Sequence, residues 1–173
     1  INKRVLLTAI LLGVGITSNI AFGMGADAYE YYQKALIAEK NQKIDDAILY
    51  TQSALNLASN DALLHTKLAG LYQQKGDWEK ALREYKSALS SNPNDAFVYI
   101  SIGNILQQHS DYNGALNAYN QAMRLSDDYK YNYLNIATVK RLQGKYDEAV
   151  DYYKKFLMYY PSHTEARESL AII

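Results

Sequence analysis

The sequence predicts an all-α solenoid built of antiparallel helix pairs, and three observations carry this prediction. Alanine recurs at positions 47, 81, 115 and 149, so each copy follows the last by 34 residues. Mostly apolar residues stand three places before, four places after and seven places after these alanines, a spacing that marks one face of a helix. Two prolines and nine glycines in 173 residues favour long helices over a loop-rich or many-stranded fold.

Composition bounds the class of protein. Hydrophobic residues make up 49% of the chain and charged residues 21%, which indicates a folded globular body rather than a disordered chain or a polytopic membrane protein. Eighteen basic and eighteen acidic residues cancel, so no net field attracts nucleic acid, and we expect no nucleic-acid partner. The chain has no cysteine, which excludes disulfides, thiolate metal sites and a cysteine nucleophile.

Residues 1–23 have the three-part layout of a secretory signal peptide. Lys3 and Arg4 precede an apolar run over residues 5–16, and the small residues Ala21 and Gly23 would allow a cut after position 23. Cleavage there would release the remainder of the chain on the far side of the cytoplasmic membrane.

A retained membrane anchor is the alternative for the same segment. No charge lies between Val5 and Ala26, and these 22 residues could span a bilayer, which needs about 20. In both cases the basic amino end stays in the cytoplasm, so we expect the rest of the chain outside it, periplasmic or secreted. Contact with a membrane would involve only residues 1–26, and only if the segment is retained.

The periodic stripes define the elements in chain order. After a linker at 24–27, each 34-residue unit carries two stripes and therefore two amphipathic helices. Residues 164–173 match a first helix only and predict a C-terminal capping helix that covers the exposed face of the last pair. We predict units at 28–61, 62–95, 96–129 and 130–163, with helix pairs at 28–41 and 44–58, 61–74 and 78–91, 95–108 and 112–125, and 129–142 and 146–159.

The breaks between these helices contain residues that end a helix. Gly76 and Gly144 stand between the two helices of their units, and Ser110 fills the same place in another. Glycine tolerates the left-handed conformation in which helices commonly end. Pro93 and Pro161 stand between units, where a helix cannot continue.

Residues at fixed places in this period resemble the tetratricopeptide repeat. The resemblance covers about residues 28–173, as four repeats and a cap, and the first repeat departs most from the pattern. It implies a right-handed superhelix whose first helices line a concave groove, and a binding scaffold rather than an enzyme. The residues that carry it include Leu68, Ala69, Tyr72, Gly76, Trp78, Ala81, Tyr85, Ala88 and Pro93, and again Ile102, Gly103, Ala115, Tyr119 and Ala122.

The resemblance places part of each first helix in the groove and so supplies candidate partner-binding residues. Aromatic rings bring contact area, and side-chain amides can pair with a peptide backbone. Two alternatives stay open: the aromatics cover the core, or Asn104 and Asn135 bond to each other. Ile100 stands where family members that hold acidic chaperone tails have lysine, which argues against such a tail. The candidates are Tyr29, Tyr32, Phe97, Asn104, Tyr131, Leu134, Asn135 and Arg141.

No pattern in the chain predicts catalysis, a metal site or a cofactor. His65, His109 and His163 lie far apart in the sequence, and no second ligand stands near any of them at metal-binding spacing. The acidic pairs fall in turns and first turns of helices, where negative charge favours the helix dipole. We therefore expect a protein that is not an enzyme.

Two functions from different classes follow. The first is a non-catalytic scaffold that holds a peptide or helix of another protein, in an envelope, secretion, pilus or membrane complex. The second is a structural subunit that self-assembles into an oligomer or filament, with the apolar residues 170–173 of one copy meeting the first repeat of the next.

Overall fold

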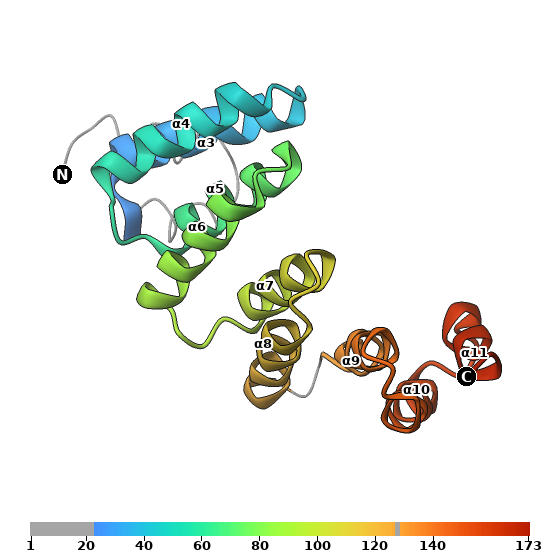
Figure 1. Cartoon of the computed structure of the whole chain (residues 1–173). Coiled ribbons are helices and arrows are strands. Elements are labelled where there is room, and N and C mark those ends of the chain that lie inside the picture. Colours follow the sequence, from blue (N-terminus) through green and yellow to red (C-terminus); the bar gives the residue numbers. More distant parts are fainter. Residues whose placement is uncertain (1–22, 127–128) are drawn as a thin grey trace. The chain divides into compact units, whose positions relative to one another are not determined.

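The computed structural model describes residues 23–126 and 129–173, so the predicted leader lies almost wholly outside the described residues. Within these ranges the chain forms nine helices and no strand, which confirms the all-α prediction. The helices are α3 (Ala26–Lys40), α4 (Ile44–Leu57), α5 (Ala62–Lys75), α6 (Trp78–Ser91), α7 (Ala96–Gln108), α8 (Tyr112–Leu125), α9 (Asn132–Leu142), α10 (Tyr146–Tyr159) and α11 (Thr164–Ala171) (Figure 1).

The chain divides after Pro93 into two compact units. The first unit contains the pairs α3–α4 and α5–α6, with α4 packed against α5. The second unit contains the pairs α7–α8 and α9–α10, and α11 packs against α10. Within each unit a helix therefore packs mainly on its neighbours in the chain, which is the contact pattern of a solenoid.

The recurring alanines lie in the buried interior of the helix pairs. Ala47, Ala81, Ala115 and Ala149 are all fully buried. A methyl group at these places lets the second helix of a pair approach the first closely, because a longer side chain would need space that neighbouring helices already fill.

A helix-capping residue also recurs with the 34-residue period. The carboxylates of Asp61 and Asp95 accept hydrogen bonds from the backbone N–H groups of Leu64 (3.0 Å) and Val98 (3.2 Å), at the starts of α5 and α7. His163 occupies the same place before α11, where its Nδ1 accepts from the Ala166 N–H at 3.3 Å. Such caps satisfy N–H groups that have no partner within the helix.

The start of α9 differs from the prediction because this cap is missing there. Tyr129 stands at the capping place and offers no side-chain acceptor to the first turn, and α9 begins at Asn132 rather than at 129. The turn before it is closed by backbone hydrogen bonds between residues three positions apart. They run from the Asn132 N–H to the Tyr129 carbonyl (3.0 Å) and from the Tyr133 N–H to the Lys130 carbonyl (3.1 Å). A 3₁₀-type turn replaces the capped first turn.

The predicted linker at 24–27 contains the first residues of a helix and one buried side chain. Helix α3 begins at Ala26, and Met24 is buried in a cluster with Ala28, Ala54 and Leu64. Met24 precedes α3 across the non-helical Gly25 (φ 85°), and its apolar side chain adds to the core by leaving water.

The turns within the four pairs share a left-handed residue at one place. Gly76 and Gly144 have φ of 84° and 73°, as expected for glycine, while Gln42 and Ser110 adopt φ of 59° and 62° at the equivalent positions. A residue with a Cβ pays about 1–2 kcal/mol for this conformation. The left-handed backbone conformation therefore recurs every 34 residues, even at Gln42 and Ser110, whose side chains disfavour it.

Replacing Gln42 or Ser110 by glycine is expected to stabilise the protein by about 0.5–1 kcal/mol each, because relief of this strain exceeds the added entropy of the unfolded chain. Urea unfolding followed by circular dichroism measures the change. Gly76→Ala is the matched control and should lower stability by about 1 kcal/mol through backbone strain alone, since a Cβ there meets nothing within 4 Å. Destabilisation by both glycine substitutions would contradict the strain argument.

Candidate protein-binding surface

A large apolar or aromatic residue recurs at one repeat place, at or just before the start of each first helix. In the first unit this place holds Tyr29, which is half-buried, and Leu63, which is 41% exposed. In the second unit it holds Phe97 and Tyr131, which are 55% and 50% exposed. Apolar side chains that stay in water at the same place of successive repeats are typical of a recognition surface.

In the first unit the predicted aromatics lie together but partly against the core. The ring centres of Tyr29 and Tyr32 are 6.4 Å apart. Both rings pack on the cluster that contains Met24 and Leu64. Burial raises the pKa of the Tyr32 phenol, with nearby negative charge on Glu39 adding to the effect. These two residues therefore both cover the core and present their remaining surface to solvent.

The charges beside this face in the first unit are already paired. Glu39 on α3 binds the ammonium group of Lys67 on α5, and Gln74 donates to the same carboxylate at 3.0 Å. Burial alone would raise the pKa of Glu39, but the hydrogen bonds from Lys67 and Gln74 outweigh it and hold the pKa below its usual range. The network ties two first helices together and leaves these groups no free charge for a ligand.

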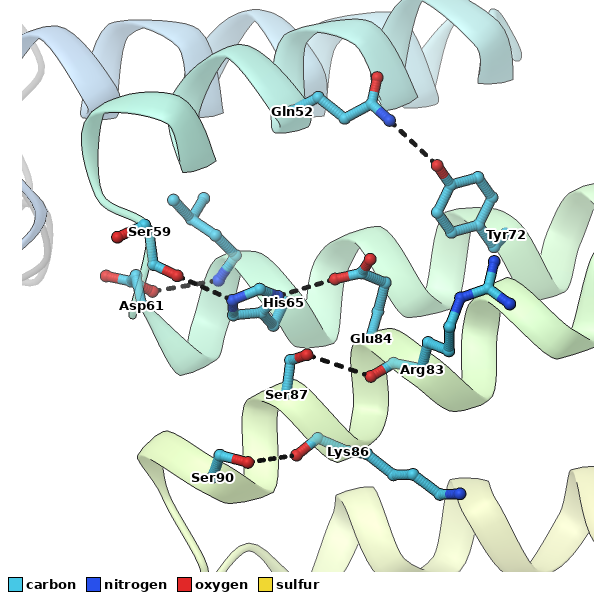
Figure 2. Close-up of polar contacts among 11 residues, drawn as sticks. Gln52, Ser59, Asp61, His65, Tyr72, Arg83, Glu84, Lys86, Ser87 and Ser90 are labelled. Carbon is cyan, nitrogen blue, oxygen red and sulfur yellow. Dashed lines mark hydrogen bonds and ion pairs between the residues drawn. The ribbon is translucent and has the colours of Figure 1, made fainter.

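The histidine of the first unit has a structural role. Figure 2 shows His65 between the Ser59 carbonyl and the Glu84 carboxylate, with Nε2 3.0 Å from the first oxygen and Nδ1 2.7 Å from the second. The ring thus connects α5 to α6 and to the preceding turn. Nearby, the Gln52 amide donates to the Tyr72 hydroxyl at 3.0 Å and joins α4 to α5 (Figure 2).

Asn104 and Asn135, the two predicted amides of the second unit, form hydrogen bonds with other residues and not with each other. The Tyr119 hydroxyl lies 2.8 Å from Oδ1 of Asn104 and 2.9 Å from Oε1 of Gln107. The Asn135 amide donates to Oδ1 of Asn132 at 3.3 Å. Both Asn104 and Asn135 are half-buried, so each keeps polar surface that a peptide backbone could meet.

The Tyr119 phenol links this surface to stability at high pH. Its ring is fully buried, and burial raises its pKa well above the usual value. In the unfolded chain the phenol releases its proton near pH 10, while in the folded state it keeps the proton at that pH. The Tyr119 contribution to stability is therefore intact below about pH 10 and falls as the pH rises further, with a slope that approaches about 1.4 kcal/mol per pH unit.

We expect Tyr119→Phe to remove this part of the alkaline loss. Urea unfolding of both proteins at pH 9, 10 and 11 measures it. The substitution lowers stability at pH 9, because it removes the hydroxyl that lies within hydrogen-bond distance of two amide oxygens. The gap to the unmodified protein narrows by about 1 kcal/mol between pH 10 and 11. Parallel curves would show that another group governs the alkaline transition.

Tyr131 belongs to an aromatic cluster that the sequence did not reveal. Its ring centre lies 5.1 Å from Phe156, 4.9 Å from Tyr160 and 6.0 Å from His163. Leu134 packs partly on the same core. The only sequence signal for His163 was its place in the capping series, 34 residues after Tyr129. The cluster holds one side of the Tyr131 ring while half of its surface stays in water.

Arg141 lines a pocket of about 300 Å³ together with Tyr146, Ile172 and Ile173. The Arg141 Nε is shielded from solvent and has no hydrogen-bond partner. Tyr146 shares its repeat place with Trp78, yet it is 55% exposed. Arg141 was predicted as a groove residue, and Ile172 and Ile173 as part of an apolar tail. Their meeting in one pocket could not be predicted, because they lie about 30 positions apart in the sequence.

The described ranges, 23–126 and 129–173, hold no group of three or more histidine, aspartate or glutamate side chains that could bind a metal ion. In the same ranges, no helix combines the length and the apolar character needed to cross a bilayer.

Helix pairs that pack on their neighbours within each unit, with surface residues recurring every 34 positions, define a helical-repeat protein. A family model described as tetratricopeptide repeat matches residues 60–128, and a second model of that description matches residues 131–163. The two matches together cover more than half of the chain, and it belongs to the tetratricopeptide repeat family.

Three solved structures that are similar in fold to this chain are a MamA protein, YrrB and PilF. A MamA protein is 21% identical, with a TM-score of 0.80 over 86% of this chain and 81% of its own. YrrB, described as a TPR protein with an unusual peptide-binding site, is 18% identical, with a TM-score of 0.75 over 90% of this chain and 80% of its own. PilF of Pseudomonas aeruginosa is 24% identical, with a TM-score of 0.69 over 83% of this chain and 66% of its own. A comparison with curated protein sequences gives no match.

Proposed function

We propose that this protein is a non-catalytic scaffold that binds a peptide or helix of a partner protein on the exposed face of its first helices. The observation that carries the proposal is the recurrence of exposed Leu63, Phe97 and Tyr131 at one repeat place. Keeping such side chains in water costs free energy that partner binding would recover. The peptide-binding site described for YrrB, on the same fold, supports this assignment.

In the second unit the side chains suit an extended peptide. Phe97, Tyr131 and Leu134 supply apolar contact, and the amides of Asn104 and Asn135 have surface left for backbone hydrogen bonds. The Tyr119 hydroxyl is hydrogen-bonded to Asn104, and Oδ1 of Asn132 accepts from Asn135, so both amides are held in position. Prepositioned groups of this kind reduce the ordering cost of binding.

A photocrosslinking amino acid placed at Phe97 or Tyr131 tests the binding face. The protein carrying it is irradiated in intact cells, and covalent adducts are identified by mass spectrometry. Tyr159 on α10 is a matched control, because it is the same residue type with the same 50% exposure but stands on a second helix. We expect one partner to crosslink from positions 97 and 131 and not from 159. Adducts from position 159 alone would move the interface to the second helices.

We also propose that the folded part lies outside the cytoplasmic membrane, in an envelope, secretion, pilus or membrane complex. The support is the layout of residues 1–23, with two basic residues before an uncharged apolar run. Alkaline phosphatase fused after residue 173 should be active in cells, since that enzyme works only after export. An inactive fusion would refute the location, and activity that survives deletion of residues 1–23 would show that this segment does not direct the export.

Self-assembly is a second candidate that one observation favours. Ile172 is 79% exposed, and Ile37, Leu49 and Leu57 of the first pair are each more than half exposed. Apolar surface at both ends of a repeat array is what copies would bury on stacking. Light scattering of the protein at tens of micromolar separates the two candidates. An oligomer that dissociates on Ile172→Asp substitution supports self-assembly, and a monomer supports the scaffold.

A further inference from the structure

The cap at the start of α11 differs chemically from the caps at the same repeat place before α5 and α7. Asp61 and Asp95 accept the first-turn N–H groups with carboxylates. His163 accepts the Ala166 N–H with its imidazole Nδ1, at 3.3 Å. A carboxylate stays ionised down to about pH 4, whereas an imidazole ring takes up a proton between about pH 5 and 8. The cap of α11 therefore depends on pH near neutrality, and the two aspartate caps do not.

Protonation of His163 acts unfavourably on the start of α11 in two ways. The neutral ring carries its proton on Nε2, because Nδ1 accepts the bond from Ala166. In the imidazolium ion both nitrogens are donors, so the cap is present at high pH and is lost as the pH falls. The ion also places a positive charge at the positive end of the helix dipole. Together these effects correspond to about a tenfold loss in the stability of the first turn.

The groups around the imidazole ring do not replace this bond. The ring centres of Tyr131 and Phe156 lie 6.0 Å and 5.0 Å from it, both edge to face. The carbonyl of Tyr160 accepts the backbone N–H of the capping histidine at 3.1 Å. The charged side chains on the first turn of α11, Glu165 and Arg167, are exposed. Aromatic faces attract a cation, but this attraction does not restore an acceptor for the N–H at the helix start.

The same ring contacts the candidate binding surface. Tyr131 is 50% exposed, and its covered side lies against Phe156, Tyr160 and His163. A change at the start of α11 that moves the imidazole ring removes one of the three contacts that fix Tyr131. The protonation of one side chain thus reaches an exposed aromatic of the proposed surface.

His65 has the opposite requirement and gives a comparison within the chain. Its Nδ1 lies 2.7 Å from the Glu84 carboxylate and its Nε2 lies 3.0 Å from the Ser59 carbonyl, and both of these groups are acceptors. A protonated ring donates to both, so acid preserves this link in the first unit. His109 ends α7, where a positive charge is favoured by the helix dipole. Acid therefore acts against the structure at His163 and not at the other two histidines.

We propose that His163 is a pH-sensitive cap whose protonation opens the first turn of α11, loosens Tyr131 and weakens partner binding on the second unit. The last step rests on the proposed scaffold function, and the first two concern this chain alone.

Nitrogen NMR of the imidazole rings in the purified protein tests the cap. At pH 8 Nδ1 of His163 should be the unprotonated nitrogen. Between pH 8 and 5 amide exchange at Ala166, corrected for its intrinsic pH dependence, should accelerate about tenfold. The Val98 amide is the matched control, because it stands at the same repeat place under the Asp95 carboxylate. A proton on Nδ1 at pH 8, or equal changes at Ala166 and Val98, would overturn the proposal.

His163→Asp tests whether this one side chain causes the response. The variant introduces the carboxylate that the chain already has before α5 and α7, so the cap should survive at pH 5 and Ala166 should then follow Val98. His109→Gln is the matched control, because it removes an exposed histidine from another helix and should leave the response of Ala166 unchanged. A response that persists in His163→Asp would assign the pH dependence to another group.

Crosslinking from position 97 tests the step to partner binding, because it leaves Tyr131 in place. The yield of the partner adduct in cell extract should fall at least fivefold from pH 8 to 5, and it should stay constant in His163→Asp. A constant yield in the unmodified protein, with a normal NMR response at Ala166, would overturn the coupling to the surface and leave the scaffold in place. A lack of adducts at both pH values would remove the scaffold, while the NMR comparison still decides the cap.

Discussion

Phe156→Ala is expected to lower the free energy of unfolding by about 3–5 kcal/mol, measured by urea denaturation. Phe156 is fully buried and packs with Ala137, Ala149, Tyr153 and Ala166, which joins α10 to α9 and α11. Removing the ring takes away its apolar burial and leaves a cavity that rigid helices fill only in part.

A second substitution tests whether the cavity left by Phe156 is the cause of the lost stability. In the first unit the equivalent joint between pairs places the small Ala54 against the large Leu64, while the last joint places the large Phe156 against the small Ala166. Adding Ala166→Leu to Phe156→Ala should therefore restore a large part of the lost stability. Ala166→Leu alone should cost about 1–3 kcal/mol through overpacking. A double variant no more stable than Phe156→Ala would contradict this complementarity of size.

Asn132→Leu is expected to raise the free energy of unfolding by about 1–3 kcal/mol. Asn132 is 1% exposed, and its Nδ2 group has no hydrogen-bond partner. At the same repeat place the chain has buried Leu64 and Val98, so an apolar side chain suits the site. Leucine removes the cost of a buried donor without a partner.

Asn120→Leu is the control for this substitution. Asn120 is exposed on α8, so the same change there should stay within about 0.5 kcal/mol. Thermal and urea unfolding of the three proteins measure the difference. A fall in stability on Asn132→Leu would show that the Asn132 Nδ2 group is hydrogen-bonded in solution, or that the bond from Asn135 to Asn132 Oδ1 outweighs its cost. A gain in stability with weaker partner crosslinking from Tyr131 would show that the amide serves the surface through its bond to Asn135.

The helix pairs could be predicted because their signals are local and repeat. Ala81 and Ala115 mark the packed face, Gly76 marks a turn, and Asp95 precedes a helix that it caps. Each of these residues acts within a few positions of itself, so its place in the period is enough to predict its role. The error at the start of α9 had the same local origin, since the sequence analysis did not treat Tyr129 as the loss of a cap.

The candidate surface could be predicted only in outline. The repeat place of Phe97 and Tyr131 followed from the 34-residue period, and their exposure agrees with a surface position. Their neighbours could not be inferred in this way. Whether a ring at such a place is half covered, as Tyr131 is by Phe156 and Tyr160, depends on side-chain packing after the helices have met.

The fold class, the order of the helices and most of the turns could be predicted, because they depend on periodicity and on residues near in the chain. Which polar groups meet is set by the packing of the folded helices: Glu39 binds Lys67, Asn104 bonds to Tyr119, and Arg141 Nε has no partner. The first two pairs join residues 28 and 15 positions apart on different helices. Such contacts depend on helix crossing angles and side-chain rotamers, and a periodic pattern carries no information on either.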